Sequence, residues 1–243
     1  MLKTFSITDI GVMRKVNQDY IYTSEQPVGH LPNLFLVADG MGGHNAGDYA
    51  SKVTVETIVE QIAASAERDP VRAFRESIRE ANRLIRTLAE QAPEMEGMGT
   101  TVVAASIAGS RLSVANVGDS RLYVVNRREI RQITRDHSWV GEMVQRGGIR
   151  REEARNHPKK NIITRAVGAE EEIQADFFTV QLEEGDTVLM CTDGLTNMLE
   201  DERIRMILAQ SSDLVEKTEN LVRTANDNGG RDNISVILIE PLV

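Results

Sequence analysis

Five aspartates lie where short apolar or β-branched stretches begin or end, and they are the residues of this sequence best suited to chemistry. They are Asp19, Asp39, Asp119, Asp193 and Asp232. All except Asp19 have a glycine within two residues. Glycine lets the backbone approach a ligand closely, although it also forms ordinary tight turns. Because all five aspartates share a position at a strand end, ligand binding by their carboxylates is favoured over a role in turns alone.

The run Leu34–His44 shows this pattern most clearly. Its apolar part predicts a buried strand, and Asp39 and Gly40 follow that strand at once. Carboxylates that converge without His or Cys form an oxygen-rich site, which prefers magnesium or manganese to zinc. Two such cations held close together activate a water for attack on phosphorus. Without cations, burial of these carboxylates would be costly because like charges repel.

The elements that must position these aspartates alternate between groups of strands and pairs of helices. Strands are predicted at residues 3–10, 20–24, 34–39, 100–107, 111–117, 121–126, 129–133, 174–181, 186–191 and 233–240. Helices are predicted at about residues 47–66, 70–92, 201–210 and 213–226. Asp69 is the predicted N-cap of the second helix, with Pro70 in its first turn. Residues 135–165 are predicted to be a long, irregular connection.

This order of elements predicts an α+β fold. Strands joined by hairpins indicate antiparallel sheets, and pairs of helices must cover sheet faces. We therefore expect a four-layer α-β-β-α sandwich, in which two antiparallel sheets face each other and a helix pair flanks each sheet. No linker, repeat or low-complexity segment divides the chain, so one domain over residues 1–243 is predicted.

Composition excludes some classes of function. Of the 243 residues, 41% are hydrophobic and 27% are charged, which is typical of a globular protein with a substantial core. The formal net charge of −9 argues against nucleic-acid binding. The single cysteine, Cys191, excludes an intrachain disulfide and is expected in a buried strand. No signal-peptide pattern or apolar run of membrane-spanning length is present, so a cytoplasmic protein without a membrane span is predicted.

Eight motifs follow one another along nearly the whole chain: Gly11–Asp19, Val37–His44, Gly99–Thr101, Ala115–Arg121, Asp136–Ser138, Ile163–Gly168, Cys191–Thr196 and Gly230–Ser235. In these motifs the chain resembles the metal-dependent serine/threonine protein phosphatases, the PPM or type 2C family, in its compact bacterial form. The fold of that family, two antiparallel sheets flanked by helix pairs, agrees with the layers predicted above.

The resemblance implies a site with two divalent cations, Mn²⁺ or Mg²⁺. Asp39 would bridge the two ions, and the carbonyl oxygen of Gly40 would be a further ligand. The other implied ligands are Asp193 and Asp232 at the first ion, Asp19 at the second, partly through water, and Asp119 at a third, weaker ion. A hydroxide that bridges the metals would attack phosphorus in line, without a covalent intermediate.

Further residues receive roles from the same resemblance. Arg14 would bind the substrate phosphate, a geometry that suits a guanidinium group. His44 would be the general acid, with a structural or water-ordering role as the alternative, and Asn233 would support the metal ligands. His137 is expected to be structural. Residues 138–161, termed the flap here, would correspond to the variable loop beside the active site in this family.

The expected function is hydrolysis of phosphoserine and phosphothreonine in proteins, as part of bacterial signalling. Phosphorylated proteins, including a cognate serine/threonine kinase and its substrates, are the expected partners, and a monomer is expected. Two alternatives remain open. One is a catalytically inactive regulatory or binding module of the same fold, and the other is a hydrolase of small phosphate esters.

Overall fold

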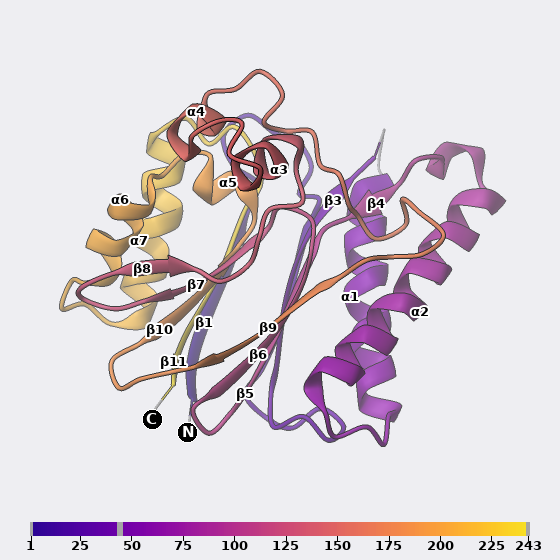
Figure 1. Cartoon of the computed structure of the whole chain (residues 1–243), viewed down its shortest axis with the longest axis horizontal. Coiled ribbons are helices and arrows are strands. Elements are labelled where there is room, and N and C mark those ends of the chain that lie inside the picture. The colour runs from indigo at the N-terminus through magenta and orange to yellow at the C-terminus, as the bar shows by residue number, and fades with distance from the viewer. Residues whose placement is uncertain (1, 43–45, 242–243) are drawn as a thin grey trace.

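The computed structural model describes residues 2–42 and 46–241. Over these residues, two antiparallel sheets pack face to face and a helix pair covers the outer face of each (Figure 1). The predicted four-layer α+β architecture is thus confirmed. Among the described helices, none combines the length and the apolar character needed to cross a membrane.

The two sheets take strands from both halves of the chain. The first has the order β1 (Leu2–Asp9), β11 (Ile234–Pro241), β10 (Thr187–Cys191), β7 (Arg121–Val125) and β8 (Ile130–Gln132). The second has the order β2 (Asp19–Ser24), β3 (Leu34–Met41), β5 (Val102–Ala108), β6 (Arg111–Val117) and β9 (Asp176–Gln181), with β4 (Gly99–Thr100) paired to β3. Each sheet therefore joins segments that are far apart in sequence.

The outer layers are the helix pairs. They are α1 (Ala46–Ala64) with α2 (Pro70–Gln91) on the second sheet, and α6 (Asp201–Leu208) with α7 (Leu214–Asp227) on the first. The Asp69 carboxylate accepts a hydrogen bond from the Val71 amide at 3.0 Å, which confirms the predicted N-cap of α2. A short 3₁₀ helix, η1 (Pro93–Met95), follows α2.

Strand β3 is buried on both faces, which explains its unbroken apolar sequence. Leu34 and Leu36 pack into the cluster beneath α1 and α2. Phe35 and Val37 point the other way, into the cluster between the two sheets. Successive residues of a strand face opposite sides, so a strand covered on both sides has no polar alternation. This central strand delivers Asp39 to the rim of the sandwich.

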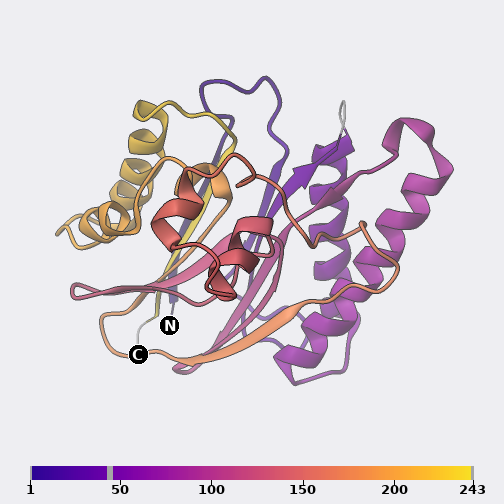
Figure 2. The ribbon, with the colours of Figure 1, turned by 45° about the horizontal axis from the view of Figure 1, so that its top comes forward.

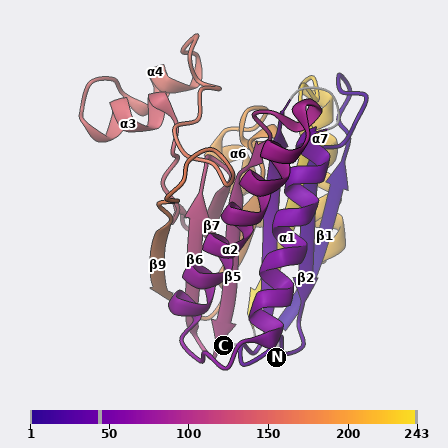
Figure 3. The ribbon, with the colours of Figure 1, turned by 90° about the vertical axis from the view of Figure 1, so that its right-hand side faces the viewer.

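The long connection differs from its prediction. It contains two short helices, α3 (Trp139–Gln145) and α4 (Arg151–Arg155). The hydroxyl of Ser138 caps α3 by accepting from the Gly141 amide at 3.1 Å. Helices this short complete too few turns to show a clear apolar period. Figure 3 shows α3 and α4 lying beyond one end of the sheets, and in Figure 2, where that end is turned forward, they lie in front of the sheets.

Two smaller corrections concern the neighbourhood of the aspartates. The strand predicted at residues 100–107 is divided into β4 and β5, because β4 pairs with the end of β3 beyond Asp39. A four-residue helix, α5 (Asp193–Thr196), follows β10 directly and was not predicted. The first feature involves strand residues within two positions of Asp39, and the second contains Asp193.

Candidate metal centre

The predicted aspartates come together at one rim of the sandwich. Asp19 and Asp39 are opposite each other in the antiparallel pair β2–β3. Asp193 follows β10, Asp232 precedes β11, and Asp119 lies in the turn between β6 and β7. The α3–α4 segment lies at the same end of the molecule (Figure 1). Facing sheets thus bring residues from five parts of the chain together.

Asp19 is held by two hydroxyl groups. Its carboxylate oxygen Oδ2 accepts a hydrogen bond from Ser235 Oγ at 2.7 Å and another from Thr192 Oγ1 at 2.8 Å. The side chain is buried, and its second oxygen, Oδ1, has no hydrogen-bond partner within the described part of the chain. One oxygen is therefore fixed by the protein while the other remains available to a ligand.

The backbone around Asp39 is fixed by two threonines. The amide of Asp39 donates to Thr101 Oγ1 at 3.0 Å, and its carbonyl accepts from Thr100 Oγ1 at 2.8 Å. Gly40 follows at a point where a Cβ atom would lie 1.9 Å from the carbonyl oxygen of Gly47. Only glycine fits there, because Gly47 in the first turn of α1 lies directly against this end of β3.

Asp193 starts α5 and contacts a residue one turn later. Its Oδ2 accepts a hydrogen bond from Asn197 Nδ2 at 2.8 Å. Its Oδ1 is buried and, among the described residues, has no hydrogen-bond partner. Gly194 packs against β11 so closely that a Cβ atom would lie 1.9 Å from the Asn233 carbonyl oxygen. The short helix is thereby fixed against the strand that follows Asp232.

Arg14 and Asp232 form an ion pair at the edge of the centre. The Nη2 of Arg14 lies 2.8 Å from Oδ2 of Asp232. Asn233 accepts from the Gln18 amide at 2.9 Å and donates to the carbonyl oxygens of Ile10 and Val16. The side-chain amide of Asn233 therefore holds the loop that carries Arg14.

The negative charges of the clustered aspartates repel one another, which makes each carboxyl group harder to ionise. Burial raises the pKa of Asp19 to about 7 and that of Asp193 to about 6, and neighbouring carboxylates add to both shifts. Burial, again with nearby carboxylates, holds the pKa of Asp39 and that of Asp119 well above the usual range. Hydrogen bonds from Ser235 and Thr192 act in the opposite direction on the pKa of Asp19.

A hard divalent cation fits these donors. A cation would satisfy the two partnerless oxygens of Asp19 and Asp193, and its charge would offset the burial and the repulsion that raise their pKa values. The donors are carboxylates, which Mg²⁺ and Mn²⁺ prefer. As the side chains stand, no three His, Cys, Asp or Glu residues in the described ranges form a ready ligand group for one ion. The fit rests on single oxygens that converge and not on a closed cage.

Other predicted residues have different surroundings. His44 lies outside the described residues. His137 is buried, accepts from the Gly118 amide at 3.1 Å through Nδ1, and has Nε2 3.3 Å from Oδ2 of Asp176. Both ring nitrogens are thus engaged in holding the turn before Asp119, which agrees with the structural role predicted for His137. Cys191 is buried in β10, as expected, and burial raises the pKa of its thiol.

Three residues that donate hydrogen bonds to the aspartates were not predicted from the sequence. Thr192 and Ser235 lie within recognised motifs, but each has the character of an ordinary residue beside a strand. Their spacing relative to Asp193 and Asp232 is the only signal that could have revealed them. Asn197 follows Asp193 by four residues, which is one helical turn, and would have been found had α5 been predicted.

Comparison with known proteins agrees with this geometry. Residues 13–238 match the family model described as protein phosphatase 2C. The chain belongs to this family. A family member of Listeria monocytogenes, serine/threonine phosphatase stp, is 41% identical in an alignment of 241 positions that covers 96% of this chain and 93% of the relative. The structure of the S. agalactiae serine/threonine phosphatase matches with a TM-score of 0.91 and 40% identity, over 98% of this chain and 99% of that one.

A second family structure bears on the metals. It is the catalytic domain of the serine threonine protein phosphatase PstP in complex with 2 manganese ions, with a TM-score of 0.86, 32% identity and coverage of 98% of this chain and 97% of that one. The family and its named members establish the class of enzyme. The chain is a hydrolase, a protein phosphatase of the serine/threonine type.

Proposed function

We propose that the chain removes phosphate from phosphoserine and phosphothreonine in proteins with the help of two divalent cations, Mn²⁺ or Mg²⁺. The observation that carries this proposal is the pair of buried oxygens, Oδ1 of Asp19 and Oδ1 of Asp193, without a partner in the described residues. The family and the manganese complex of PstP support dependence on a divalent metal. When bound, the ions neutralise charge at the phosphate and supply an activated water.

Different residues of the chain are proposed to hold the two ions. Asp39 is proposed to contact both ions, with the carbonyl oxygen of Gly40 as a further ligand, because both residues lie near the end of the central strand β3. Asp193 and Asp232 would complete the first site. Asp19 would support the second, partly through water, and its two hydroxyl partners would orient it and favour its ionised form.

A third, weaker ion is proposed near Asp119 and Asp193. The support is electrostatic, because the charge of Asp193 contributes to the raised pKa of Asp119. Asn233 is proposed as a supporting residue that holds the loop before Asp19.

Arg14 is proposed to bind the substrate phosphate. Its guanidinium group is half exposed and lies beside Asp232, and the charges of Asp39 and Asp193 also raise its pKa. It is therefore a permanent positive charge at the edge of the cluster, placed where a phosphate dianion would arrive. A proton must also reach the leaving serine or threonine oxygen, and His44 remains the prediction for that general acid.

We propose phosphorylated proteins as partners, with a cognate serine/threonine kinase and its targets as the physiological set. The chain is proposed to act as one domain with a flap at residues 138–161. Monomeric state and cytoplasmic location stay predictions from the sequence.

Removal of the metals and of one ligand tests this assignment. Chelation should abolish hydrolysis of a phosphothreonine peptide, and Mn²⁺ should restore it. Asp193→Asn should lose nearly all activity at every Mn²⁺ concentration, while circular dichroism shows an intact fold. A fully active variant would overturn the metal role of Asp193.

Substrate comparison separates the alternatives. A protein phosphatase should give a higher kcat/KM on phosphopeptides than on p-nitrophenyl phosphate, whereas a hydrolase of small esters should show the reverse. A regulatory module would hydrolyse neither substrate in the presence of Mn²⁺. The four aspartates proposed for the two main ions are all present, which favours an active enzyme.

A further inference from the structure

The flap is a loop whose two ends are hydrogen-bonded to each other. Ser138 and Ile163 form an isolated antiparallel bridge, and the Trp139 amide donates to the Ile162 carbonyl at 2.8 Å. Trp139, the only tryptophan of the sequence, stacks on His157 with ring centroids 4.9 Å apart. The segment between these ends is therefore held together by contacts of its own.

Two basic side chains of the flap contact residues in and around α5. The Arg155 guanidinium donates to the Thr196 carbonyl at 2.9 Å and lies 2.7 Å from Glu200 Oε1. The ammonium group of Lys160 donates to Asn197 Oδ1 at 3.2 Å. These contacts attach the flap to the helix that begins with Asp193.

Asn197 connects the flap to the metal centre through both ends of its amide. Its Oδ1 accepts from Lys160, and its Nδ2 donates to Asp193 Oδ2. An ammonium group only donates and a carboxylate only accepts, so a reversed amide would break both hydrogen bonds. The contact with Lys160 thus fixes the orientation in which Asn197 can serve Asp193.

These contacts span a cavity and are not part of a packed interface. A cavity of about 490 Å³ lies between the flap and α5, lined by Val140 and Val144 on one side and by Asp119 and Asp193 on the other. Lys160 also lines it. Because few apolar contacts would be lost with one such side chain, replacement of Lys160 should leave the fold intact.

We propose that Asn197 is a positioning residue through which Lys160 of the flap controls the Asp193 carboxylate. The proposal rests on the metal role of Asp193 proposed above. With the flap in place, Asn197 holds Oδ2 of Asp193 and leaves Oδ1 directed to a cation. Coupling of this kind is reciprocal, so cation binding at Asp193 must also favour the attached position of the flap.

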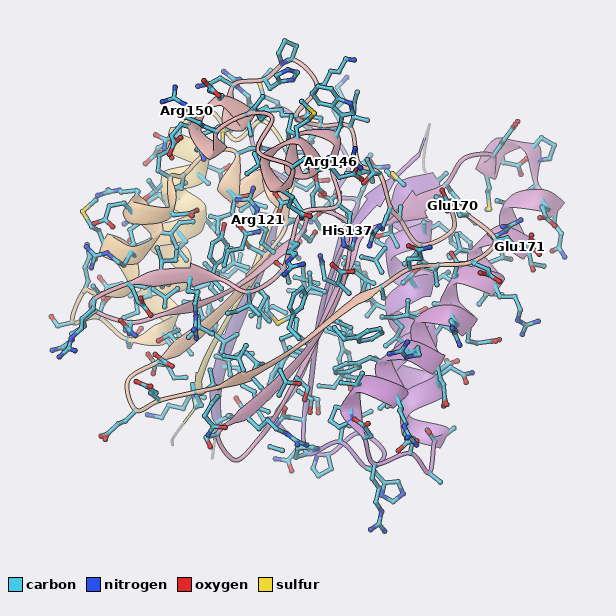
Figure 4. All side chains as sticks on the ribbon, in the orientation of Figure 1. Arg121, His137, Arg146, Arg150, Glu170 and Glu171 are labelled. Atoms are coloured by element: carbon cyan, nitrogen blue, oxygen red, sulfur yellow. The ribbon has the colours of Figure 1, made fainter. Side chains whose placement is uncertain are left out.

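The reciprocal effect can be measured without any reaction. Mg²⁺ is titrated into metal-free protein by calorimetry, and the access of acrylamide to Trp139 is measured with and without Mg²⁺. The variants are Asn197→Ala, Lys160→Met and both together. Arg146→Met is the matched control, because Arg146 is a flap cation whose ion pair, with Glu142, stays inside the flap (Figure 4).

We expect Mg²⁺ to reduce acrylamide quenching of Trp139 in the wild type and in Arg146→Met. Asn197→Ala should weaken Mg²⁺ binding by roughly tenfold, as is common for residues that orient a metal ligand. Lys160→Met should weaken it about fivefold and abolish the effect of Mg²⁺ on quenching. Because both act through one contact, the double variant should bind Mg²⁺ no more weakly than Asn197→Ala.

Three results would each overturn the coupling. The first is that Mg²⁺ does not change acrylamide quenching of Trp139 in the wild type, and the second is that Lys160→Met binds Mg²⁺ as tightly as the wild type. The third is that the losses of Mg²⁺ affinity in the two single variants add up in the double variant. Asp193→Asn separates this failure from failure of the proposed function. If that variant binds Mg²⁺ as tightly as the wild type, Asp193 is not a metal ligand, and the proposed coupling is refuted as well.

Discussion

Asp19 and Asp39 face each other across β2 and β3 as register partners, so two carboxylates leave neighbouring strands at the same level. Residues directly opposite in an antiparallel pair project on the same face with their Cβ atoms close together. Like charges in that arrangement destabilise the fold, and burial increases the cost. The strand pairing itself thus builds a site that a bound cation would stabilise.

Metal-free protein should lose stability through Asp19 as the pH rises from about 4 to about 7. The pKa of this carboxyl group is about 7 in the fold, against 3.8 for an ordinary aspartate. The folded chain therefore keeps a proton that the unfolded chain releases. The stabilisation is complete below the unfolded pKa and is lost as the pH approaches 7.

Asp19→Asn isolates this effect because asparagine has the same shape and does not ionise. In EDTA, the free energy of unfolding of the wild type should fall relative to the variant by about 1.4 kcal/mol per pH unit at most. Urea unfolding at pH 5, 6 and 7 measures it. A difference that stays constant with pH would mean that Asp19 is already ionised at pH 5.

Ser235→Ala should weaken the metal centre. The change removes one of the two hydroxyl donors to Oδ2 of Asp19, so the carboxylate is less well oriented and harder to ionise. Mn²⁺ affinity should fall by roughly tenfold or more. Calorimetry and the Mn²⁺ dependence of peptide dephosphorylation measure it. Ser106→Ala is the control, because the Ser106 hydroxyl is buried without a hydrogen-bond partner in the described residues; equal affinities in the two variants would contradict the prediction.

Gly194→Ala should destabilise the protein by about 3 kcal/mol or more, since the new methyl group would collide with the Asn233 backbone. Gly109→Ala is matched to it. Gly109 has a φ of +61° in a hairpin, and no atom of the described residues lies within 4 Å of the place its new methyl group would take. Only backbone strain of about 1 kcal/mol is therefore expected there. Chemical denaturation compares the two variants, and similar losses would show that Asn233 moves aside easily.

Arg14→Gln should impair catalysis far more than stability. The ion pair with Asp232 is partly exposed to solvent, so its loss should change the free energy of unfolding by less than about 1 kcal/mol. Loss of the phosphate contact should lower kcat/KM by roughly a hundredfold on phosphopeptides and on p-nitrophenyl phosphate alike. Lys15→Gln removes an adjacent charge and should have little effect. Comparable losses in both variants would indicate general attraction of the substrate by charge.

The fold was largely predictable because its signals are local. Asp69 and Pro70 indicate the start of α2, and the apolar period of α2 continues over many turns. β3 is recognisable from its unbroken apolar run. The flap helices were missed because α4 spans five residues, and its contacts, such as that of Arg155 with Thr196, lie far away in sequence.

The site was predictable as a set of aspartates and not as a geometry. Turn residues around Asp39 and Asp193 indicate where carboxylates leave strands. Nothing in the sequence shows that Thr192 and Ser235 donate to the same oxygen of Asp19, since that contact joins residues more than 170 positions apart. Which oxygen is fixed and which is free for a cation depends on the packing of the two sheets.

Pairing of β1 with β11 places Leu2 opposite Pro241, so the two ends of the described chain lie side by side. Figure 1 shows both ends at the edge of the sandwich remote from α3 and α4. An attachment at either end, whether a fused partner, a lipid tether or a solid support, would therefore present the catalytic rim outward in the same orientation.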